Sequence, residues 1–354
     1  MVRILVLGGT WQLGRLVAAN AVAREWEVTT FNRGLGTLTP VHGVRHVRGD
    51  RGVDADLRTL RGHGPWDAVV DISGKVPTVV RRSAEALVDV TEKYLSVSTV
   101  SAYRDWPTVQ VDEESPLLDE SGDARPAGEP DTYGRRKAAC EHACREIFGG
   151  DRLLSVRLHD VIGQEEDLGP VLWWLNRIRR GGPVLVPAPD RAIQAVDVQD
   201  VARFLVDLSE RRVVGAVNVA AEAAADRTFE QLLTDCLEVV TADRTAGPEL
   251  VWVEEDWLAE HEVQEQTELP LWRRAGGGGV TAERAAALGL QCRPLRATVS
   301  DTWARAQAAG FRADHERIMR YGMPAEREAD LLARWDAQPA SARPAGLQRV
   351  MPIP

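Results

Sequence analysis

The strongest constraint on the fold of this chain lies at its start, where an apolar run meets a glycine-rich turn. Residues 2–7 (VRILVL) are rich in β-branched residues and leucine, the composition of a strand buried on both faces. The segment GGTWQLG follows at residues 8–14, and the helical segment RLVAANAVARE comes directly after it. The apolar run is too short for a signal peptide and ends in the turn. This order predicts the first strand, turn and helix of a parallel sheet.

The same alternation continues through residue 158. Helices are expected at 15–25, 76–93 and 133–148. Further strands are expected at 27–31, 46–48, 67–72, 94–97 and 152–158. Strands that alternate with helices predict an α/β fold with a Rossmann-type, doubly wound parallel sheet.

After residue 164 the rhythm changes and indicates a second, smaller lobe of mixed α/β structure. We expect a Rossmann domain over 1–164, to which residues 192–220 return. Residues 165–191 and 221–337 are assigned to the second lobe, which is expected to bind the substrate. The Pro- and Ala-rich segment 338–354 is expected to be disordered.

The glycine-rich turn predicts a dinucleotide site. The N-terminus of the helix points backbone N–H groups and a positive dipole end at a phosphate, and glycines let the backbone approach it. The residues predicted to bind the cofactor here are Gly8, Thr10, Trp11, Gln12, Leu13 and Gly14. Trp11 stands where the usual pattern has its middle glycine. Its ring either covers the cofactor or packs into the core.

The end of the second strand favours NADP(H) over NAD(H), which remains the alternative. NAD-binding proteins usually place an acid there for the ribose 2′-hydroxyl, whereas this chain has Asn32 followed by Arg33. A guanidinium suits a 2′-phosphate, although Arg33 could also be a solvated loop residue. Asp50 and Arg51, in the segment RGDRG, are predicted on the adenine side, with a simple turn as the alternative.

Tyr133 and Lys137 have the spacing YxxxK, which puts them on one face of a helix. A nearby ammonium lowers the pKa of a phenol, so that it can exchange protons near neutral pH. Ser98 and Thr99 follow the strand 94–97, and hydroxyls at that end of a parallel sheet are where ligands bind.

Together these motifs resemble the short-chain dehydrogenase/reductase superfamily, in its extended or atypical branch of NAD-dependent epimerases/dehydratases. SVSTVSAYRD at 96–105, VRLHDVIG at 156–163 and VDVQDVA at 196–202 are similar to patterns of that branch. The turn and the segment FNRG also resemble the chloroplast stem-loop-binding proteins and bacterial reductase-like relatives. The resemblance covers residues 1–240 well and the remainder loosely.

The resemblance implies roles for individual residues. Tyr133 would be the general acid/base, and Lys137 would tune it and bind the nicotinamide ribose. Thr99 would hold the reacting oxygen, with Ser98 as its substitute and as a cofactor contact. Further cofactor contacts would be Ile72, Ser73, Gly74 and Leu158, and substrate contacts would be Lys75, Thr99, His159 and Asp160.

Three functions follow as hypotheses. The first is an NAD(P)(H)-dependent oxidoreductase that interconverts a carbonyl and a secondary alcohol on a small molecule. The second is an epimerase of a sugar or sugar nucleotide. The third is a non-enzymatic, redox-sensing or RNA-associated protein. Dehydration is disfavoured, because Thr99 is followed by Val100 and Ser101 rather than by a pair of carboxylates.

Composition bears on partners and location. The net charge of −10 is the opposite of what a nucleic-acid-binding protein usually shows. The four cysteines form no CxxC pair, so buried thiols are expected in place of a metal site. No apolar stretch is long enough for a membrane span, and a cytoplasmic protein is expected. By analogy with the superfamily, a homodimer is expected.

Overall fold

The computed structural model describes residues 1–35, 40–118, 133–163, 169–187, 189–224, 226–242, 247–274, 278–310 and 321–338. The chain forms two compact units. Unit 1 contains Met1–Val161, Val198–Ala220 and Gly278–Gln291, and unit 2 contains Ile162–Asp197, Ala221–Gly277 and Cys292–Pro354.

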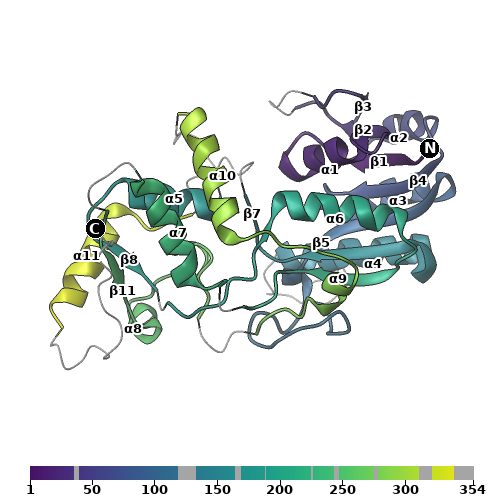
Figure 1. Ribbon diagram of the computed structural model, residues 1–354. Helices are drawn as coiled ribbons and strands as arrows, with labels where there is room; N and C mark the ends of the chain where they lie inside the picture. Colours follow the sequence, from purple (N-terminus) through teal and green to yellow (C-terminus); the bar gives the residue numbers. More distant parts are fainter. Residues whose placement is uncertain are drawn as a thin grey trace. The chain divides into compact units, whose positions relative to one another are not determined.

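Unit 1 is built on a seven-stranded sheet in the order β10-β6-β5-β4-β1-β2-β3, and every paired strand is parallel to its neighbour (Figure 1). Its strands are β1 (Arg3–Leu7), β2 (Glu27–Asn32), β3 (Val44–Arg48), β4 (Trp66–Asp71), β5 (Thr91–Thr99), β6 (Leu153–Leu158) and β10 (Gly215–Val219). This confirms the doubly wound Rossmann-type fold. The order reverses at β1, so the carboxyl ends of β1 and β4 form the crevice where such sheets bind ligands.

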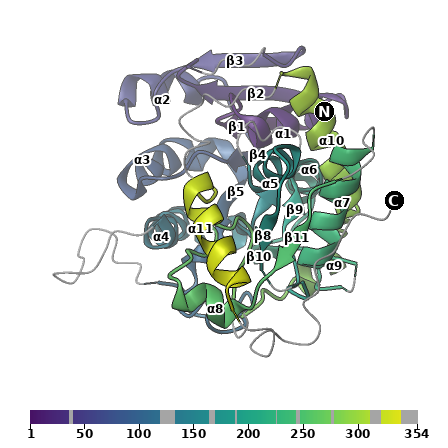
Figure 2. The ribbon, with the colours of Figure 1, turned by 90° about the vertical axis from the view of Figure 1, so that its left-hand side faces the viewer.

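Helices cover both faces of this sheet (Figure 2). On one face, α1 (Gln12–Val22) packs against α6 (Val198–Glu210). On the other, α3 (Pro77–Leu87) packs against both α2 (Asp54–Arg61) and α4 (Tyr133–Arg152), whose helical geometry breaks at Gly149.

Burial on both faces explains the apolar strands. In β1, the side chains of Ile4, Leu5 and Val6 are all fully buried. Leu5 belongs to a core cluster with Val80 of α3 and Phe148 of α4. Two 3-10 turns adjoin β5, η1 (Val88–Val90) before it and η2 (Val100–Ala102) after it, and α9 (Glu283–Ala287) completes the unit.

Unit 2 has its own hydrophobic core around a two-stranded parallel sheet. Its elements are α5 (Pro170–Arg179), β8 (Val184–Val186), α7 (Phe229–Thr241), β11 (Leu250–Trp252), α8 (Glu255–Glu260), α10 (Leu295–Ala308) and α11 (Ala325–Asp336). The chain leaves unit 1 through β7 (Val161–Ile162) and returns through β9 (Val196–Asp197), and these two strands pair. Trp174 is fully buried in this core, and Trp173 is partly buried against it.

Three expectations differ from the structure. The helix predicted over 76–93 ends at Leu87, and β5 already begins at Thr91. Residues 278–291, assigned above to the second lobe, belong to unit 1, and the return to unit 1 starts at Val198 instead of residue 192. The predicted disordered tail lies outside the described residues, apart from Gln338.

Candidate active site

The glycine-rich turn after β1 forms a cradle that side chains would fill. Gly8 and Gly9 have φ angles of +125° and +86°, which residues with a Cβ rarely adopt. A Cβ on Gly14 would lie 2.6 Å from the backbone nitrogen of Gly9. The first turn of α1 therefore approaches the strand closely, and its N–H groups face the end of the sheet where a phosphate can bind.

Trp11 is compatible with this turn although it replaces a glycine. It is the N-cap of α1, with φ −114° and ψ 170°, an extended conformation open to any residue. Its side chain is 50% exposed, so it is not part of the core. Thr10, Gln12 and Leu13, the other predicted cofactor contacts here, are partly buried.

Asn32 ties the end of β2 to the glycine turn. Its Nδ2 donates to the carbonyl oxygen of Gly8 at 2.6 Å, and its Oδ1 accepts the N–H of Gly34 at 2.9 Å. The Asn32 amide thus holds the turn in place, and the adjacent Arg33 is exposed.

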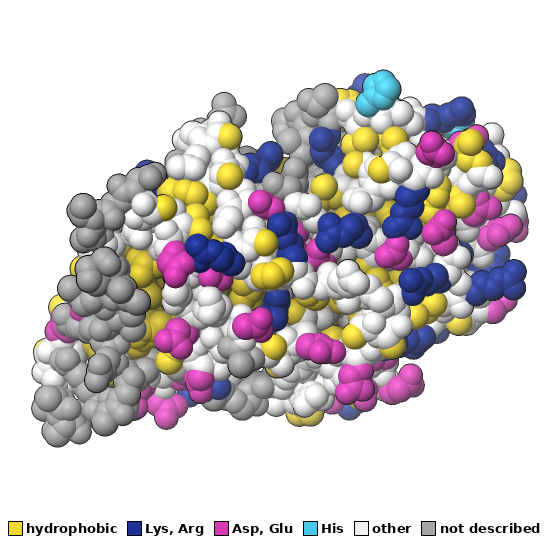
Figure 3. Space-filling model, in the orientation of Figure 1, with side chains coloured by type: hydrophobic (Ala, Val, Ile, Leu, Met, Phe, Trp, Pro, Cys, Tyr) yellow, Lys and Arg dark blue, Asp and Glu magenta, His cyan; other side chains and the backbone are white. Residues whose placement is uncertain are grey.

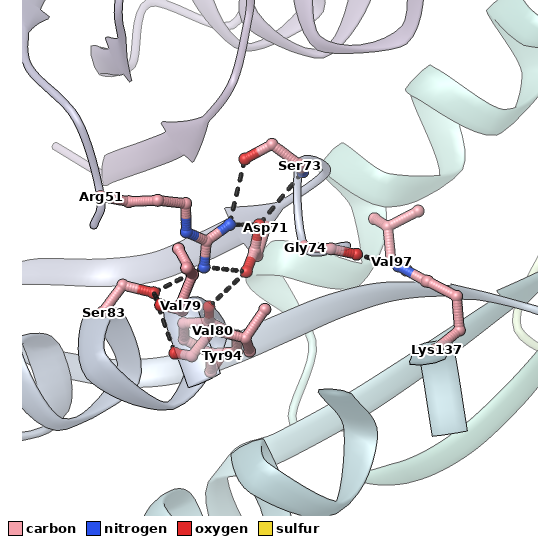
Figure 4. A network of polar contacts seen from close by, with 10 residues as sticks. All are labelled: Arg51, Asp71, Ser73, Gly74, Val79, Val80, Ser83, Tyr94, Val97 and Lys137. Atoms are coloured by element: carbon pink, nitrogen blue, oxygen red, sulfur yellow. Dashed lines mark hydrogen bonds and ion pairs between the residues drawn. The ribbon is translucent and has the colours of Figure 1, made fainter. Parts of the chain in front are cut away.

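Arg51 reaches from the loop after β3 into the sheet (Figure 4). Its Nη1 and Nη2 bind Oδ1 and Oδ2 of Asp71 at 2.8 and 2.7 Å, and Asp71 is 2% exposed. Nη1 also donates to Ser73 Oγ, Nη2 donates to Ser83 Oγ, and the Tyr94 hydroxyl donates to Asp71 at 2.7 Å. Arg51, which the sequence analysis predicts on the adenine side of the cofactor, directs both terminal nitrogens to these protein groups.

Charge pairing decides the ionisation of this network. Burial works against the charge on Asp71, but the Arg51 guanidinium outweighs it and lowers the pKa of the carboxyl. Burial raises the pKa of the Tyr94 phenol, and the Asp71 carboxylate raises it further. Asp50, next to Arg51, accepts the N–H of Gly52 at 2.8 Å. This is the bond of a simple turn, which the sequence analysis gives as the alternative to a contact with the adenine side.

The network continues to Lys137 through the loop after β4. Ser73 N–H donates to Asp71 at 3.1 Å, and Lys137 Nζ donates to the carbonyl oxygens of Gly74 and Val97 at 2.7 and 2.5 Å. Lys137 is 4% exposed, and burial lowers its pKa. These two carbonyls are its hydrogen-bond partners among the described residues, which leaves one of its three N–H groups for a ligand.

Tyr133 begins α4 and has a different environment. It is 49% exposed, and burial of the phenol raises its pKa. The sequence analysis expected Lys137 to lower that pKa. In the structure the Lys137 ammonium is instead directed at backbone carbonyls of the sheet, and no hydrogen bond joins these two described side chains.

Gly134, which the sequence analysis did not single out, fixes the start of α4. A Cβ there would lie 1.9 Å from the carbonyl oxygen of Ser101 in η2. Only glycine permits this approach. In the sequence, its position directly after the tyrosine of YxxxK could have indicated this residue.

The end of β5 carries the two predicted hydroxyls. Thr99 is 8% exposed, and its Oγ1 accepts the N–H of Ser101 at 3.2 Å, which caps η2. Ser98 is 4% exposed, and its Oγ is buried without a hydrogen-bond partner in the described part of the chain. A buried hydroxyl left in this state is suited to a ligand.

The remaining predicted residues lie at neighbouring strand ends. Ile72 and Ser73 contact the glycine turn, because a Cβ on Gly8 would be within 4.0 Å of both. Leu158 ends β6 and is 8% exposed. The other three predicted residues are half-buried or exposed, and they are His159, Asp160 and Lys75.

A second buried ion pair, also absent from the sequence analysis, holds α4 on the sheet. Arg157 of β6 donates to both oxygens of Glu141 at 3.0–3.3 Å and to the Tyr103 hydroxyl at 2.9 Å. Tyr103 in turn donates to Asn218 of β10 at 2.6 Å. Glu141 lies four residues after Lys137 on the same helix, a spacing that could have indicated it.

The described residues contain no group of three or more His, Cys, Asp or Glu side chains placed to hold a metal ion. No helix among them has the length and apolarity to cross a membrane.

Comparisons with known proteins bear on the fold. No family model matches the sequence, and no curated protein matches it. Among solved structures, the Bordetella bronchiseptica enzyme WbmH in complex with NAD⁺ aligns with a TM-score of 0.64 at 19% identity, over 88% of this chain and 100% of that one.

Two further structures give the same result. The WbmG enzyme of Bordetella bronchiseptica with NAD and UDP aligns with a TM-score of 0.63 at 18% identity, over 91% of this chain and 99% of that one. UDP-glucose 4-epimerase from Thermotoga maritima with UDP-glucose aligns with a TM-score of 0.61 at 16% identity, over 87% and 99%. This chain therefore has the fold of these NAD-binding and sugar-nucleotide epimerase structures.

Proposed function

We propose that this chain is an NAD(P)(H)-dependent enzyme that acts on a secondary alcohol or its carbonyl, with Tyr133 as general acid/base. The observation that carries the proposal is the pairing of two features in unit 1. Gly8, Gly9 and Gly14 form a phosphate cradle, and Gly134 holds the helix of Tyr133 and Lys137 against the turn that follows Thr99. A dinucleotide fits the donors present.

The cofactor would be held by the N-terminus of α1, by α4 and by the end of β5. The α1 N-terminus would bind the pyrophosphate, and the free N–H of Lys137 would bind the nicotinamide ribose. Ser98, whose buried hydroxyl has no partner in the described part of the chain, is positioned for the same ligand. The chemistry that a bound nicotinamide supplies is hydride exchange with the substrate carbon.

The protein would supply the proton and orient the oxygen. Tyr133 would give its phenolic proton to the substrate oxygen or take one from it. Since burial raises the pKa of Tyr133 here, the phenolate would need added positive charge, which an oxidised nicotinamide would supply when bound. Thr99 would donate a hydrogen bond to the same oxygen.

Epimerisation of a sugar or sugar nucleotide is the second candidate, and the solved structures support it better than net oxidoreduction. The aligned proteins include UDP-sugar 4-epimerases, with 86–87% of this chain covered. In this case Tyr133 would take the hydroxyl proton when a hydride leaves the substrate carbon for a bound nicotinamide. It would return the proton to the oxygen once the hydride has come back to the other face of that carbon. Unit 1 would bind the cofactor.

One experiment tests the enzyme proposal and separates the two reactions. The purified protein would be incubated with NAD(P)⁺ or NAD(P)H and a panel of sugar nucleotides and simple carbonyl compounds, followed at 340 nm and by NMR. An oxidoreductase changes the absorbance stoichiometrically with product. An epimerase inverts a carbon centre without net change at 340 nm. Failure to bind any nicotinamide dinucleotide would falsify the proposal.

A homodimer would pair through α4 and α3. An RNA-associated role has less support, because the net charge is −10 and basic and acidic side chains are interspersed over the face drawn in Figure 3.

A further inference from the structure

The carboxyl ends of β2 and β3 carry two guanidinium groups on one edge of the sheet. The register pairs Asn32 with Arg48, so the last residue of β2 lies beside the last residue of β3. Arg33 follows Asn32 directly, and both arginines are exposed. Sequence alone could not join Arg33 and Arg48, because they are separated by 15 positions.

Arg48 is fixed in this position by the backbone of the neighbouring loop. Its Nε donates to the carbonyl oxygen of Arg33 at 3.2 Å. Its side chain also packs over Gly34, where a Cβ would lie 3.5 Å from Nε and 3.6 Å from Cδ. The Nε contact uses one of the five N–H donors of the Arg48 guanidinium.

The loop owes its shape to Asn32. Its Oδ1 accepts the N–H of Gly34, and Gly34 has a φ of +71°. This turn brings the Arg33 carbonyl toward Arg48. Asn32 carries an amide where NAD-binding proteins have a carboxylate, and its Nδ2 and Oδ1 are bonded to Gly8 and Gly34.

The charge balance at this edge is positive. No salt bridge joins either arginine to a carboxylate among the described residues, and Asp50, two positions after Arg48, accepts the N–H of Gly52. We propose that Arg48 and Arg33 together form a two-guanidinium site for the 2′-phosphate of NADP(H), with Arg48 as a specificity-determining residue. This inference rests on the proposed use of a nicotinamide dinucleotide.

Two guanidiniums match the chemistry of a phosphate monoester. Such a group carries nearly two negative charges at neutral pH and has three acceptor oxygens. Arginine binds it through two parallel N–H donors, an arrangement that lysine does not reproduce. NAD(H) has a neutral hydroxyl at this place and gains nothing from the pair.

The test uses two mononucleotides that differ only in the 2′-phosphate, 2′,5′-ADP and 5′-AMP. Their affinities would be measured by calorimetry, next to NADPH and NADH. We expect 2′,5′-ADP to bind the native protein more tightly. Arg48→Ala should weaken 2′,5′-ADP and NADPH by about tenfold and leave 5′-AMP and NADH within about twofold. The affinity of Arg48→Lys for 2′,5′-ADP and NADPH should lie between those of the native protein and Arg48→Ala.

Arg45→Ala is the matched control. Arg45 is an exposed arginine three residues earlier on β3, so the variant makes the same change in net charge. Arg45→Ala should leave the affinities for 2′,5′-ADP and 5′-AMP unchanged. Equal weakening of 2′,5′-ADP and 5′-AMP in Arg48→Ala, or no weakening, would overturn the inference. Equal NADH and NADPH binding by the native protein would overturn it while keeping the proposed function, whereas binding of no dinucleotide would overturn both.

Discussion

Gly134 at the start of α4 meets Ser101 of η2 so closely that a Cβ on the glycine would lie 1.9 Å from the Ser101 carbonyl oxygen. Tyr133 precedes this glycine, and Thr99 caps the turn that contains Ser101. The contact therefore sets the position of the proposed acid/base relative to the hydroxyl that orients the substrate. It makes Gly134 a positioning residue for the proposed reaction.

Gly134→Ala should displace α4 from η2. Overpacking of this kind costs about 1–3 kcal/mol of unfolding free energy, although alanine favours helix more than glycine does. A displacement of about 1 Å at the reacting groups reduces kcat by about a hundredfold. Urea unfolding and steady-state kinetics measure the two effects.

Gly150→Ala is the control for that variant. Gly150 is near the end of α4, beyond the break at Gly149, and a Cβ there has no neighbour within 4 Å. It should change stability by less than about 1 kcal/mol and leave kcat unchanged. If both variants behaved alike, the Gly134 contact would have no part in positioning.

Tyr133→Phe should abolish proton transfer and retain the fold. Tyr133 is half exposed, so loss of its hydroxyl leaves no unsatisfied core group. General acid/base catalysis contributes about 10²- to 10⁴-fold, and kcat should fall by that factor while the dissociation constant of the cofactor stays within about twofold. A variant that keeps native kcat would assign the proton transfer to another group.

Ser98→Ala should separate ligand binding from stability. The Ser98 hydroxyl is buried without a partner in the described part of the chain, so its removal should leave the unfolding free energy unchanged or slightly higher. Affinity for the dinucleotide should fall by about three- to tenfold if this hydroxyl binds it. Titration of the native protein and of Ser98→Ala with NADPH and NADH gives the ratio of their dissociation constants.

Ser83→Ala provides the comparison. Ser83 is equally buried, but it accepts a hydrogen bond from Arg51 and donates to the Val80 carbonyl at 2.9 Å. The unfolding free energy of Ser83→Ala should be lower by about 1 kcal/mol, the net contribution of a typical hydrogen bond. Equal stability loss in both serine variants would show that Ser98 has a structural partner.

Asp71 should make stability depend on pH in the acid range. Its folded pKa lies below its ordinary value because Arg51 stabilises the carboxylate. The unfolded chain therefore takes up the proton first as pH falls, and the contribution of Asp71, complete above the unfolded pKa, is lost as pH falls through the folded pKa. Urea midpoints of the native protein and Asp71→Asn between pH 7 and pH 3 should converge as the pH falls.

The size of the Asp71→Asn effect near neutral pH is a second readout. Removing one partner of a buried ion pair costs about 3–5 kcal/mol, because the other charge stays buried. The double variant Arg51→Met/Asp71→Asn should recover part of that loss. A double variant as unstable as the sum of the single variants would mean that the pair is not coupled.

Much of unit 1 could be predicted from sequence because its strands are short apolar runs between polar loops. β1, β4 and β6 were recognised in this way, and the fold followed from their alternation with helices. α2 was missed because only Leu57 and Leu60 of its eight residues are buried, which leaves a weak pattern. β5 was predicted too short because it begins with the polar residues Thr91 and Glu92.

Candidate site residues can be proposed from the sequence where one segment supplies the signal. The spacing of Tyr133 and Lys137 is such a case. The Glu141–Arg157 pair and the Arg48–Arg33 contact each join segments far apart in sequence, and they depend on how a helix or strand lies on its neighbour. That information comes only from tertiary packing.

The divided course of unit 1 has a consequence during synthesis. β6 ends at Leu158, whereas its sheet partner β10 begins at Gly215. A ribosome must therefore deliver more than fifty residues, most of them belonging to unit 2, before that edge of the sheet is paired. An open strand edge is a template for pairing with other chains. Nascent chains that stall in this interval would be the species most prone to aggregate.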